Sequence, residues 1–431
     1  MATETAPRGP RVRERVSSAA RAVHLDEVKK GWRRLPARAR SLIPAVILLG
    51  LVATYPLYVD TLNEGWLFFP SEIPFILELP SVSTAVIMIV FVMMAVGLNI
   101  VVGYSGLLDL GYVAFYAVGA YTAGWLASGH FQQVSFHLGS VGINRDAAGI
   151  HISVWLVLLI AGAVTAIAGI LIGLPTLRLR GDYLAIVTLG FGEIIPQVVR
   201  NGDRLGGFNL TNGSFGINPI DAPGFGAGLG SAIGLPVNFQ QSFDKQNLFF
   251  WAALALLLIT IYCSVRLRDS RLGRAWIAIR EDETAAAAMG VPLMRTKTWA
   301  YAIGAFFGGV AGAYYSSFKA GAFPSDFYFN ISVFLLCMVI LGGMGSVWGV
   351  VVAGAILSYL NQEGLSNIGT WLNRDTPVSF EVAKYQFGIY GLIIVLMMLF
   401  RPTGLIPESR RKQEIEEGVH DGETLYGDRH A

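Results

Sequence analysis

Long apolar runs separated by short polar segments follow one another along most of the chain. As an α-helix, such a run needs about 20 residues to cross roughly 30 Å of hydrocarbon, because each residue advances the helix by about 1.5 Å. By this measure the sequence predicts an all-α polytopic membrane protein with about ten transmembrane helices. The expected helices are residues 41–59, 81–102, 106–127, 152–174, 182–199, 248–266, 296–318, 327–341, 347–362 and 385–400.

The composition agrees with this pattern. Hydrophobic residues make up 53% of the 431 residues and charged residues only 14%, a balance typical of polytopic membrane proteins. The net charge of +2 conceals an uneven distribution, since residues 41–144 contain no Lys or Arg. The basic residues therefore give no indication of a nucleic-acid partner, and their positions report instead on orientation in the membrane.

Basic residues predict how the chain is oriented, because cytoplasmic segments of membrane proteins are enriched in Lys and Arg. Residues 1–40 carry eleven Lys and Arg against four Asp and Glu and contain no apolar run of signal-peptide type, which predicts a basic cytoplasmic tail. Ten spans then place the acidic loop 60–80 outside and the Arg-rich segment 266–297 inside. The C-terminal tail, 408–431, also falls inside, so both termini are expected in the cytoplasm.

The predicted spans form one transmembrane domain, residues 41–407, with two long loops. The outer loop, 200–247, is rich in Gly, Asn, Ser and Pro and is either a lid, a docking surface for another protein or a plain linker. The cytoplasmic loop is 267–295. Both cysteines, Cys263 and Cys337, lie in expected spans, where packing is a better interpretation than a disulfide or a metal site.

No catalytic or metal-binding motif accompanies these helices. The sequence has no G-x-x-x-x-G-K-[ST] phosphate loop, no His, Cys and Asp cluster at the spacing of metal ligands, and no nucleophile elbow. The chain is therefore expected to be no enzyme and to hold neither a metal nor a cofactor of its own. If it takes part in active transport, another subunit must supply the energy.

The cytoplasmic segment Asp269–Pro292 is the best candidate for contact with such a subunit. It contains the helix-forming run "ETAAAAMG", which Gly290 is expected to terminate. A short helix between two spans forms a knob that fits a groove on a partner, whereas the alternative is a solvated loop with chance charges. The charged residues that flank this helix or favour its first turn are Arg271, Arg274, Glu281, Asp282 and Glu283.

Several longer segments resemble a known family. They are "GLNIVVGYSGLLDLGYVAFYAVGAY" (97–121), "LRLRGDYLAIVTLGFGEI" (177–194), "LGRAWIAIREDE" (272–283), "VILGGMGSVWG" (339–349) and "RPTGLIP" (401–407). In order and spacing they are similar to the permease subunits of branched-chain amino-acid ABC importers, the LivM type, over about residues 85–407. One departure lies in the outer loop, where the family commonly has T-G-G-P-x-G-I and this chain has "TNGSFGI" (211–217), with Asn212 and Ser214 in place of a glycine and the proline.

The resemblance implies the ABC importer permease fold and a multisubunit transporter in the bacterial cytoplasmic (inner) membrane. A second, related permease subunit, two ATPase subunits that bind ATP, and an extracytoplasmic binding protein that delivers leucine, isoleucine, valine or similar substrates are the implied partners. Urea or short amides, taken up by a sister branch of the family, are the alternative substrates. The family's ATPase contact maps onto Glu283, Ala285, Ala286 and Gly290, and the motif before it adds Gly273.

Glu193 is a carboxylate inside an expected span. Counted from Asp182 at the inner interface, it lies about 16 Å into the membrane. A charge facing lipid there costs at least about 2.5 kcal/mol, so Glu193 is expected to face protein or water. Pro196 cannot donate to the carbonyl of Gly192, and Gly190 loosens the same turn, which predicts a kink. A gate or inter-subunit hinge and a purely structural hydrogen bond are the two interpretations, and neither makes Glu193 a substrate ligand.

Two glycine frames join expected spans at the inner face. They are "GYSG", with Gly103, Tyr104, Ser105 and Gly106, and "GGMG", with Gly342, Gly343 and Gly345. Broken helices at related positions are typical of transport paths, but tight turns and small-residue packing account for most such glycines. Asp109, just beyond the first frame, is expected near the inner interface.

The sequence is compatible with three functions. An ABC-importer permease requires a partner ATPase and works by alternating access, in which the spans around both glycine frames and Glu193 repack. A proton-driven transporter acting through Glu193 would leave Asp269–Pro292 without a purpose, and a membrane-embedded enzyme would need catalytic groups that the sequence lacks. The cytoplasmic segment and the family motifs favour the first.

Overall fold

The computed structural model describes residues 49–63, 79–141, 146–179, 181–204, 206–225, 238–241, 245–374, 382–401 and 403–406. The chain divides into two units, Met1–Tyr58 and Val59–Ala431. The described part of the first unit is largely helical and includes the start of α3 (Tyr55–Asn63). The predicted tails 1–40 and 408–431, and most of the acidic loop 60–80, lie outside the described residues. All elements that follow belong to the second unit.

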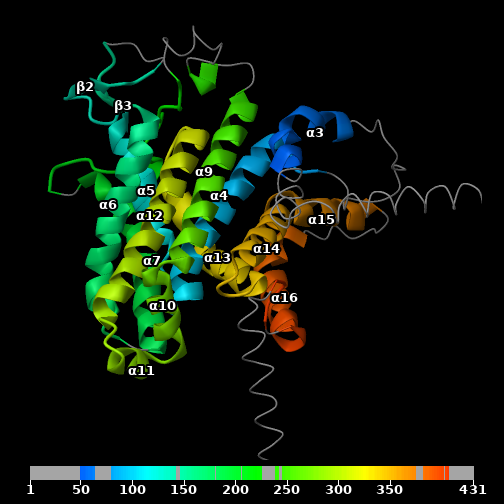
Figure 1. Ribbon diagram of the computed structural model, residues 1–431. Helices are drawn as coiled ribbons and strands as arrows, with labels where there is room; N and C mark the ends of the chain where they lie inside the picture. The colour runs from blue at the N-terminus through cyan, green and yellow to red at the C-terminus, as the bar shows by residue number, and fades with distance from the viewer. Residues whose placement is uncertain are drawn as a thin grey trace, which may run out of the picture. The chain divides into compact units, whose positions relative to one another are not determined.

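Helices dominate the second unit (Figure 1). Among the described residues, four stretches are long and apolar enough to cross a membrane: Val82–Tyr104, made of α4 (Val82–Asn99) and the π-helical η1 (Ile100–Tyr104), then α6 (Val154–Thr176), α7 (Asp182–Arg200) and α9 (Lys245–Asp269). The other apolar helices are α5 (Val113–Leu126), α12 (Leu293–Lys319), α13 (Phe329–Gly342), α14 (Val347–Tyr359) and α16 (Gln386–Phe400). Between the last two lie η6 (Leu360–Gly364), α15 (Leu365–Arg374) and η7 (Val382–Tyr385). The helical fold class predicted from the sequence is confirmed, while the number of ten spans stays a prediction.

Burial identifies α4 as the centre of this helical unit. In the most apolar window of its span 89% of the residues are buried, against 39% in α6 and 33% in α7. α4 contacts α9, α12, α13 and α14, and Ser81 caps its first turn by accepting a hydrogen bond from the backbone N of Thr84. α6 and α7 instead expose apolar side chains such as Leu171 and Ile194, 66% and 52% exposed, as helices at a lipid boundary do.

Residues 105–112 are not helical, which corrects the predicted span 106–127, because α5 begins only at Val113. A side chain remote in sequence satisfies part of this backbone, since N of Leu110 donates to Oγ1 of Thr188 at 3.0 Å. Irregular backbone is tolerated at membrane depth when protein groups take up its hydrogen bonds. This extended segment is therefore non-helical chain that is largely buried, with Gly106 and Leu108 exposed.

Asp109 is the charged side chain inside this segment. Its position near the inner interface stays a prediction, while its side chain is only 1% exposed and its Oδ1 accepts a hydrogen bond from N of Gly111 at 2.8 Å. N of Val113 donates to Oγ of Ser332 at 2.9 Å, which ties the first turn of α5 to α13. Groups from both α7 and α13 thus fix the path of residues 105–112.

A small sheet that the sequence did not predict lies at the end of the unit opposite to α10 (Arg271–Glu281) and α11 (Glu283–Ala288), as Figure 1 shows. It contains β1 (Ala127–Ser128), β2 (Ser135–Leu138) and β3 (Gly149–Ile152) in the order β1-β3-β2, with β1 antiparallel and β2 parallel to β3. Bridges Ser128–Ile220 and Ile217–Ala322 attach part of the loop 200–247 to this end. Short 3-10 turns nearby are η2 (Gly202–Arg204), η3 (Gly213–Phe215), η4 (Phe239–Gln241) and η5 (Pro324–Phe327).

Candidate functional site

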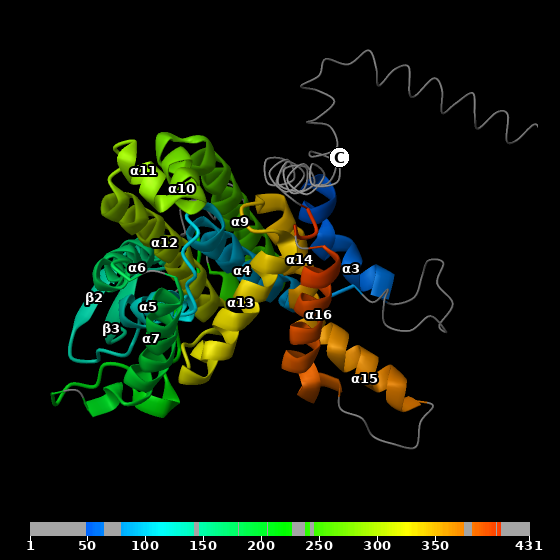
Figure 2. The same ribbon diagram turned by 90° about the horizontal axis from the view of Figure 1, so that it is seen from below.

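The predicted cytoplasmic helix is present as α11, and a second short helix that the sequence did not predict, α10, precedes it and contains Arg271 and Arg274. Figure 2 shows α10 and α11 beside α9 and α12. Ser270 caps α10 by accepting a hydrogen bond from N of Gly273 at 3.2 Å. A Cβ at Gly273 would collide with the backbone carbonyls of Leu267 and Arg268, so only glycine fits the corner between α9 and α10. Trp276 is fully buried and its Nε1 donates to O of Thr296 at 2.8 Å, which fastens α10 to α12.

Asp282 separates the two helices and caps the second. Its Oδ1 accepts hydrogen bonds from N of Thr284 at 2.8 Å and from N of Ala285 at 3.0 Å. Together with the Thr284 hydroxyl these donors favour the carboxylate, so the pKa of Asp282 is lowered from its ordinary value. Gly290 ends α11 with φ +85°, and N of Val291 donates to O of Ala286 at 3.0 Å, as in a glycine C-terminal cap. The helix boundaries read from the sequence are therefore confirmed.

Two charged groups bind α10 and α11 to the membrane helices. Oε1 of Glu283 lies 2.7 Å from Nζ of Lys297 on α12, and the lysine side chain is only 4% exposed. Arg280 donates from Nη1 to O of Gly103, at the end of η1. Sequence reasoning placed Glu283 at the partner contact and overlooked Arg280 and Lys297. A lone lysine at the start of a predicted span was the signal that pointed to Lys297.

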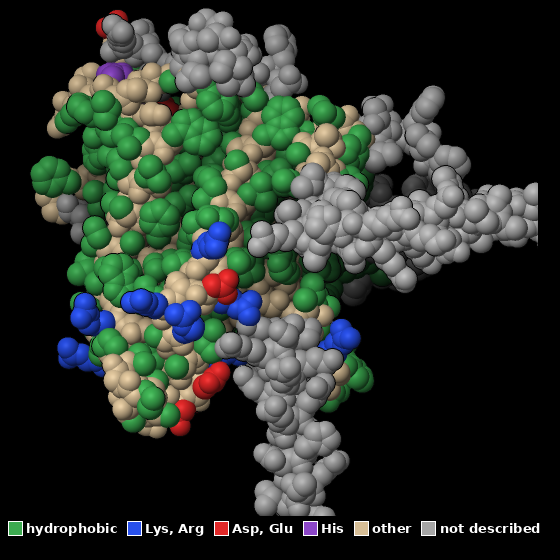
Figure 3. All heavy atoms as spheres, viewed as in Figure 1, with side chains coloured by type: hydrophobic (Ala, Val, Ile, Leu, Met, Phe, Trp, Pro, Cys, Tyr) green, Lys and Arg blue, Asp and Glu red, His purple; other side chains and the backbone are tan. Residues whose placement is uncertain are grey.

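The outward surface of α11 is small and apolar. Ala285, Ala287, Ala288 and Met289 are exposed, Met289 to 86%, whereas Ala286 alone is buried in this helix. A thioether side chain flanked by alanines adapts readily to a groove on another protein. Arg271, Arg274 and Glu281 are also exposed, and Figure 3 shows Lys and Arg side chains gathered toward this end of the unit.

A cavity of about 350 Å³ opens between this helix pair, the extended segment and the start of α7. Its charged lining residues come from α7, α10, α11 and α12 and are Asp182, Arg280, Glu281, Glu283 and Lys297. The first glycine frame borders it through Ser105 and Gly106. The two parts of the site that the sequence suggested separately, the cytoplasmic helix and the frame, are therefore neighbours.

The two glycine frames also meet each other. N of Gly345 donates to Oδ1 of Asn99 at 2.9 Å, and a Cβ at Gly103 would lie 2.6 Å from that same nitrogen. Gly343 and Gly345 have φ +102° and +91°, a backbone conformation that favours glycine. Asn99, which sequence reasoning missed, thus joins the C-terminal ends of α4 and α13.

The remaining frame residues are packed around this junction. Hydroxyl groups stabilise the first frame, since Tyr104 Oη lies 3.0 Å from Oγ of Ser264 and Ser105 Oγ donates to O of Val101 at 2.6 Å. A Cβ at Gly342 would lie 2.6 Å from the backbone of Val350, the first turn of α14. These contacts leave almost no free space, so the junction moves as a unit or not at all.

α7 places its four predicted residues on different faces. Gly192 and Pro196 are buried, with Gly192 against Gly111 in the extended segment. Glu193 is exposed, and a Cβ at Gly190 would meet no atom within 4 Å. The helix runs unbroken through Pro196 from Asp182 to Arg200. The kink predicted at Pro196 stays a prediction.

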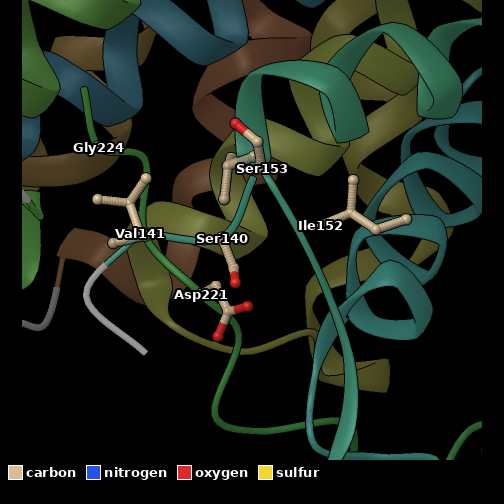
Figure 4. A pocket seen from close by; sticks show the side chains of 8 residues that line it. Ser140, Val141, Ile152, Ser153, Asp221 and Gly224 are labelled. Carbon is tan, nitrogen blue, oxygen red and sulfur yellow. The ribbon is translucent and has the colours of Figure 1, made fainter. Parts of the chain in front are cut away.

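The end of the unit opposite to α10 and α11, which is predicted to be the outer end, carries polar residues that sequence reasoning missed. Nδ1 of His151 on β3 lies 2.8 Å from Oδ2 of Asp221, and His137 stacks on His151 with ring centroids 5.1 Å apart. Burial raises the pKa of Asp221, against the opposing effect of its contact with His151. Figure 4 shows Asp221 and Ser140 lining a small pocket beside this pair.

An open groove of about 1,090 Å³ adjoins the sheet on the same outer end. Its lining comes mainly from segment 129–134 and, within segment 207–219, from residues 207–209, 212 and 217–219. Phe208 and Phe215 in the second of these segments are 79% and 81% exposed, although Asn209 and Asn212 hydrogen-bond each other and hold the loop in shape. Among the described residues, no group of three or more His, Cys, Asp and Glu could hold a metal ion.

Comparison with known proteins gives the family context of these features. Residues 81–400 match the family described as branched-chain amino acid transport system / permease component. The chain is 36% identical over 360 residues to the high-affinity branched-chain amino acid transport system permease protein LivM of Salmonella typhimurium and, likewise, of Escherichia coli, covering 81% of this chain and 75% of each relative. It is 28% identical over 176 residues to LivH of Escherichia coli, covering 40% of this chain and 51% of the relative. No solved structure matches the chain.

Proposed function

The chain belongs to the family of permease components of branched-chain amino acid transport systems, and we propose that it forms one half of the membrane pathway of an ABC importer for leucine, isoleucine, valine or similar amino acids. A second, LivH-like permease supplies the other half. Two separate ATPase subunits bind and hydrolyse ATP, and an extracytoplasmic protein delivers the substrate. The relatives, named for branched-chain amino acids, favour this substrate class over urea or short amides.

The observation that carries the proposal is the way α11 is built. Its outward residues are three alanines, Thr284 and, at the C-cap, the exposed Met289, while Glu283 is directed inward to Lys297. A helix with an apolar outer face and a rigid attachment suits insertion into a groove on a cytoplasmic ATPase. Each end of α11 is fixed by a cap, Asp282 at the start and Gly290 at the end, so its shape does not depend on the partner.

Movement of α10 and α11 together reaches the membrane helices through three contacts, one from α11 and two from α10. Glu283 contacts Lys297 and Trp276 contacts the backbone of Thr296, both in the first turn of α12. Arg280 contacts the backbone of Gly103, where the two glycine frames meet. Closure of the ATPases would therefore displace α12 and the junction of α4 with α13 together, which is how alternating access would be driven.

The outer end suits the delivery protein. Phe208 is exposed in the lining of an open groove, Phe215 is exposed on the same loop, and hydrogen bonds within this loop hold its shape. Large rigid aromatic side chains at the edge of a groove are typical anchors of protein interfaces. This surface lies at the opposite end from α11, as required for a substrate that enters from outside (Figure 1).

Uptake of labelled leucine and of labelled urea by cells carrying the complete transporter tests this proposal. Met289→Asp and Glu283→Arg should abolish leucine uptake and ATPase binding while the chain stays in the membrane, and Met289→Leu is the matched control that should retain both. Met289 is 86% exposed, so its loss affects a partner contact and not the packing of this chain. Uptake of urea alone would reassign the substrate, and leucine uptake unaffected by Met289→Asp would refute the ATPase contact.

A further inference from the structure

The outward surface of α7 divides into two neighbouring stripes. At 3.6 residues per turn, residues spaced by four, three and four lie on one line along a helix. The Glu193 stripe consists of Ile186, Gly190, Glu193 and Gln197, and the Ile194 stripe consists of Val187, Phe191, Ile194 and Val198. The opposite side of α7, which includes Leu184, Ala185, Thr188, Gly192, Pro196 and Val199, is buried.

The two stripes differ in chemistry. The Ile194 stripe is wholly apolar, and Ile194 and Val198 are 52% and 46% exposed, as expected for contact with lipid. The Glu193 stripe exposes a carboxylate and an amide at mid-span and toward the outer end. α6, which also borders lipid, exposes only apolar side chains such as Leu159 and Leu171. The Glu193 stripe is therefore not built for a hydrocarbon environment.

The free-energy cost of exposing a carboxylate to lipid determines what must cover this stripe. At mid-membrane a charged Glu193 in contact with lipid costs at least about 2.5 kcal/mol, and a neutral one still leaves polar groups without hydrogen bonds. A protein surface that carries hydrogen-bond donors removes both costs. Gly190 sits one turn below Glu193 and leaves an open notch, since a Cβ there would meet no atom within 4 Å. Small residues of this kind let a second helix approach closely.

We propose that the Glu193 stripe is the surface on which a transmembrane helix of the second permease subunit packs, with its backbone close to Gly190 and a hydrogen-bond donor opposite Glu193. This inference rests on the proposed function, because it requires a second permease. It gives Glu193 a role in assembly, where the carboxylate accepts a hydrogen bond across the interface. The Ile194 stripe, about a quarter of a turn away, remains in lipid.

Photo-crosslinking in the complete, co-expressed transporter tests the assignment. Benzoylphenylalanine introduced at Ile186 or at Gln197 should give a covalent adduct with the second permease, identified by its mass. The same group at Ile194 or at Val198 is the matched control and should give none. Adducts at neither stripe, or at both stripes equally, would overturn the inference.

Substitution of Glu193 tests the hydrogen bond itself. Glu193→Leu should lower the apparent affinity for the second permease by about tenfold, whereas Glu193→Gln, which still accepts a hydrogen bond, should stay within about threefold of the parent. Unchanged assembly of Glu193→Leu would indicate that the stripe borders lipid. Modification of Gln197→Cys by a membrane-impermeant thiol reagent in the assembled complex would indicate that it borders water. Either result would refute the inference. If the parent chain folds but no second permease binds it, the proposed function fails, and this inference with it.

Discussion

Glu283 and Lys297 form the ion pair that holds α11 against α12, so neutralising them singly and together measures that attachment. Oε1 and Nζ are 2.7 Å apart, and the two side chains are 29% and 4% exposed. At this separation two unit charges attract by about 6 kcal/mol at an effective dielectric constant of about 20, and the loss of water around them offsets most of that gain. We expect a net coupling free energy of about 1 to 3 kcal/mol.

The two single variants should differ because the charge that each leaves behind differs in burial. Glu283→Gln leaves the ammonium group of Lys297 buried and without its counter-charge, at a cost of about 2 to 3 kcal/mol. Lys297→Met leaves a carboxylate that reaches water, at a cost of about 1 kcal/mol. The double variant leaves no charge behind, so its cost should be smaller than that of Glu283→Gln alone.

Hydrogen exchange at the amides of α11 measures these free energies directly, because a helix of 6 residues does not persist after it leaves α12. For Glu283→Gln we expect exchange to accelerate by about 30- to 150-fold, with the rate of an unprotected amide as the upper limit. In the double variant exchange should be about tenfold slower than in Glu283→Gln. Glu281→Gln, at the neighbouring exposed carboxylate, should change nothing. A double variant that costs the sum of both single variants would refute the reasoning.

Three further predictions concern other parts of the chain. Gly290→Ala forces a side chain into a backbone with φ +85° and should destabilise the end of α11 by about 1 kcal/mol, read from the exchange of the same amides. Gly273→Ala places a methyl group against two backbone carbonyls that cannot rotate away, so size-exclusion chromatography should recover far less folded chain. Because burial raises the pKa of Asp221, the folded state binds this proton more tightly than the unfolded state, and the outer end should lose stability as the pH rises from 3.8 through the raised pKa. Asp221→Asn should remove this decline in stability. The assay is the protease resistance of the outer loops in right-side-out vesicles as a function of pH, and an identical pH profile in parent and variant would contradict the prediction.

Features encoded by neighbouring residues were predictable from the sequence. The limits of α11 follow from an acidic cap, an alanine run and a glycine, all within a few residues of one another. The apolar helices followed from length and hydropathy in the same way. The exposure of Glu193 did not, since the face on which a helical residue lies depends on what packs against the helix.

Features held by remote partners were not predictable. Residues 105–112 have the apolar composition of a helix, yet Thr188 supplies a hydrogen bond that allows them to stay extended. The sheet strands, at two to four residues, are too short to leave a periodic pattern. The pairing of Lys297 with Glu283 required knowing that α11 folds back on the first turn of α12.

The supports of the extended segment have a consequence for biosynthesis. Thr188 lies 78 residues after Leu110, and Ser332 lies 219 residues after Val113, so neither support exists when the segment leaves the ribosome. At about 5 to 20 residues per second, the second support follows about 10 to 40 s later. Until then the polar backbone and Asp109 must stay in contact with the insertion machinery. Chains that stop before Ser332 never complete this step, and they present quality-control proteases with an unfinished membrane segment.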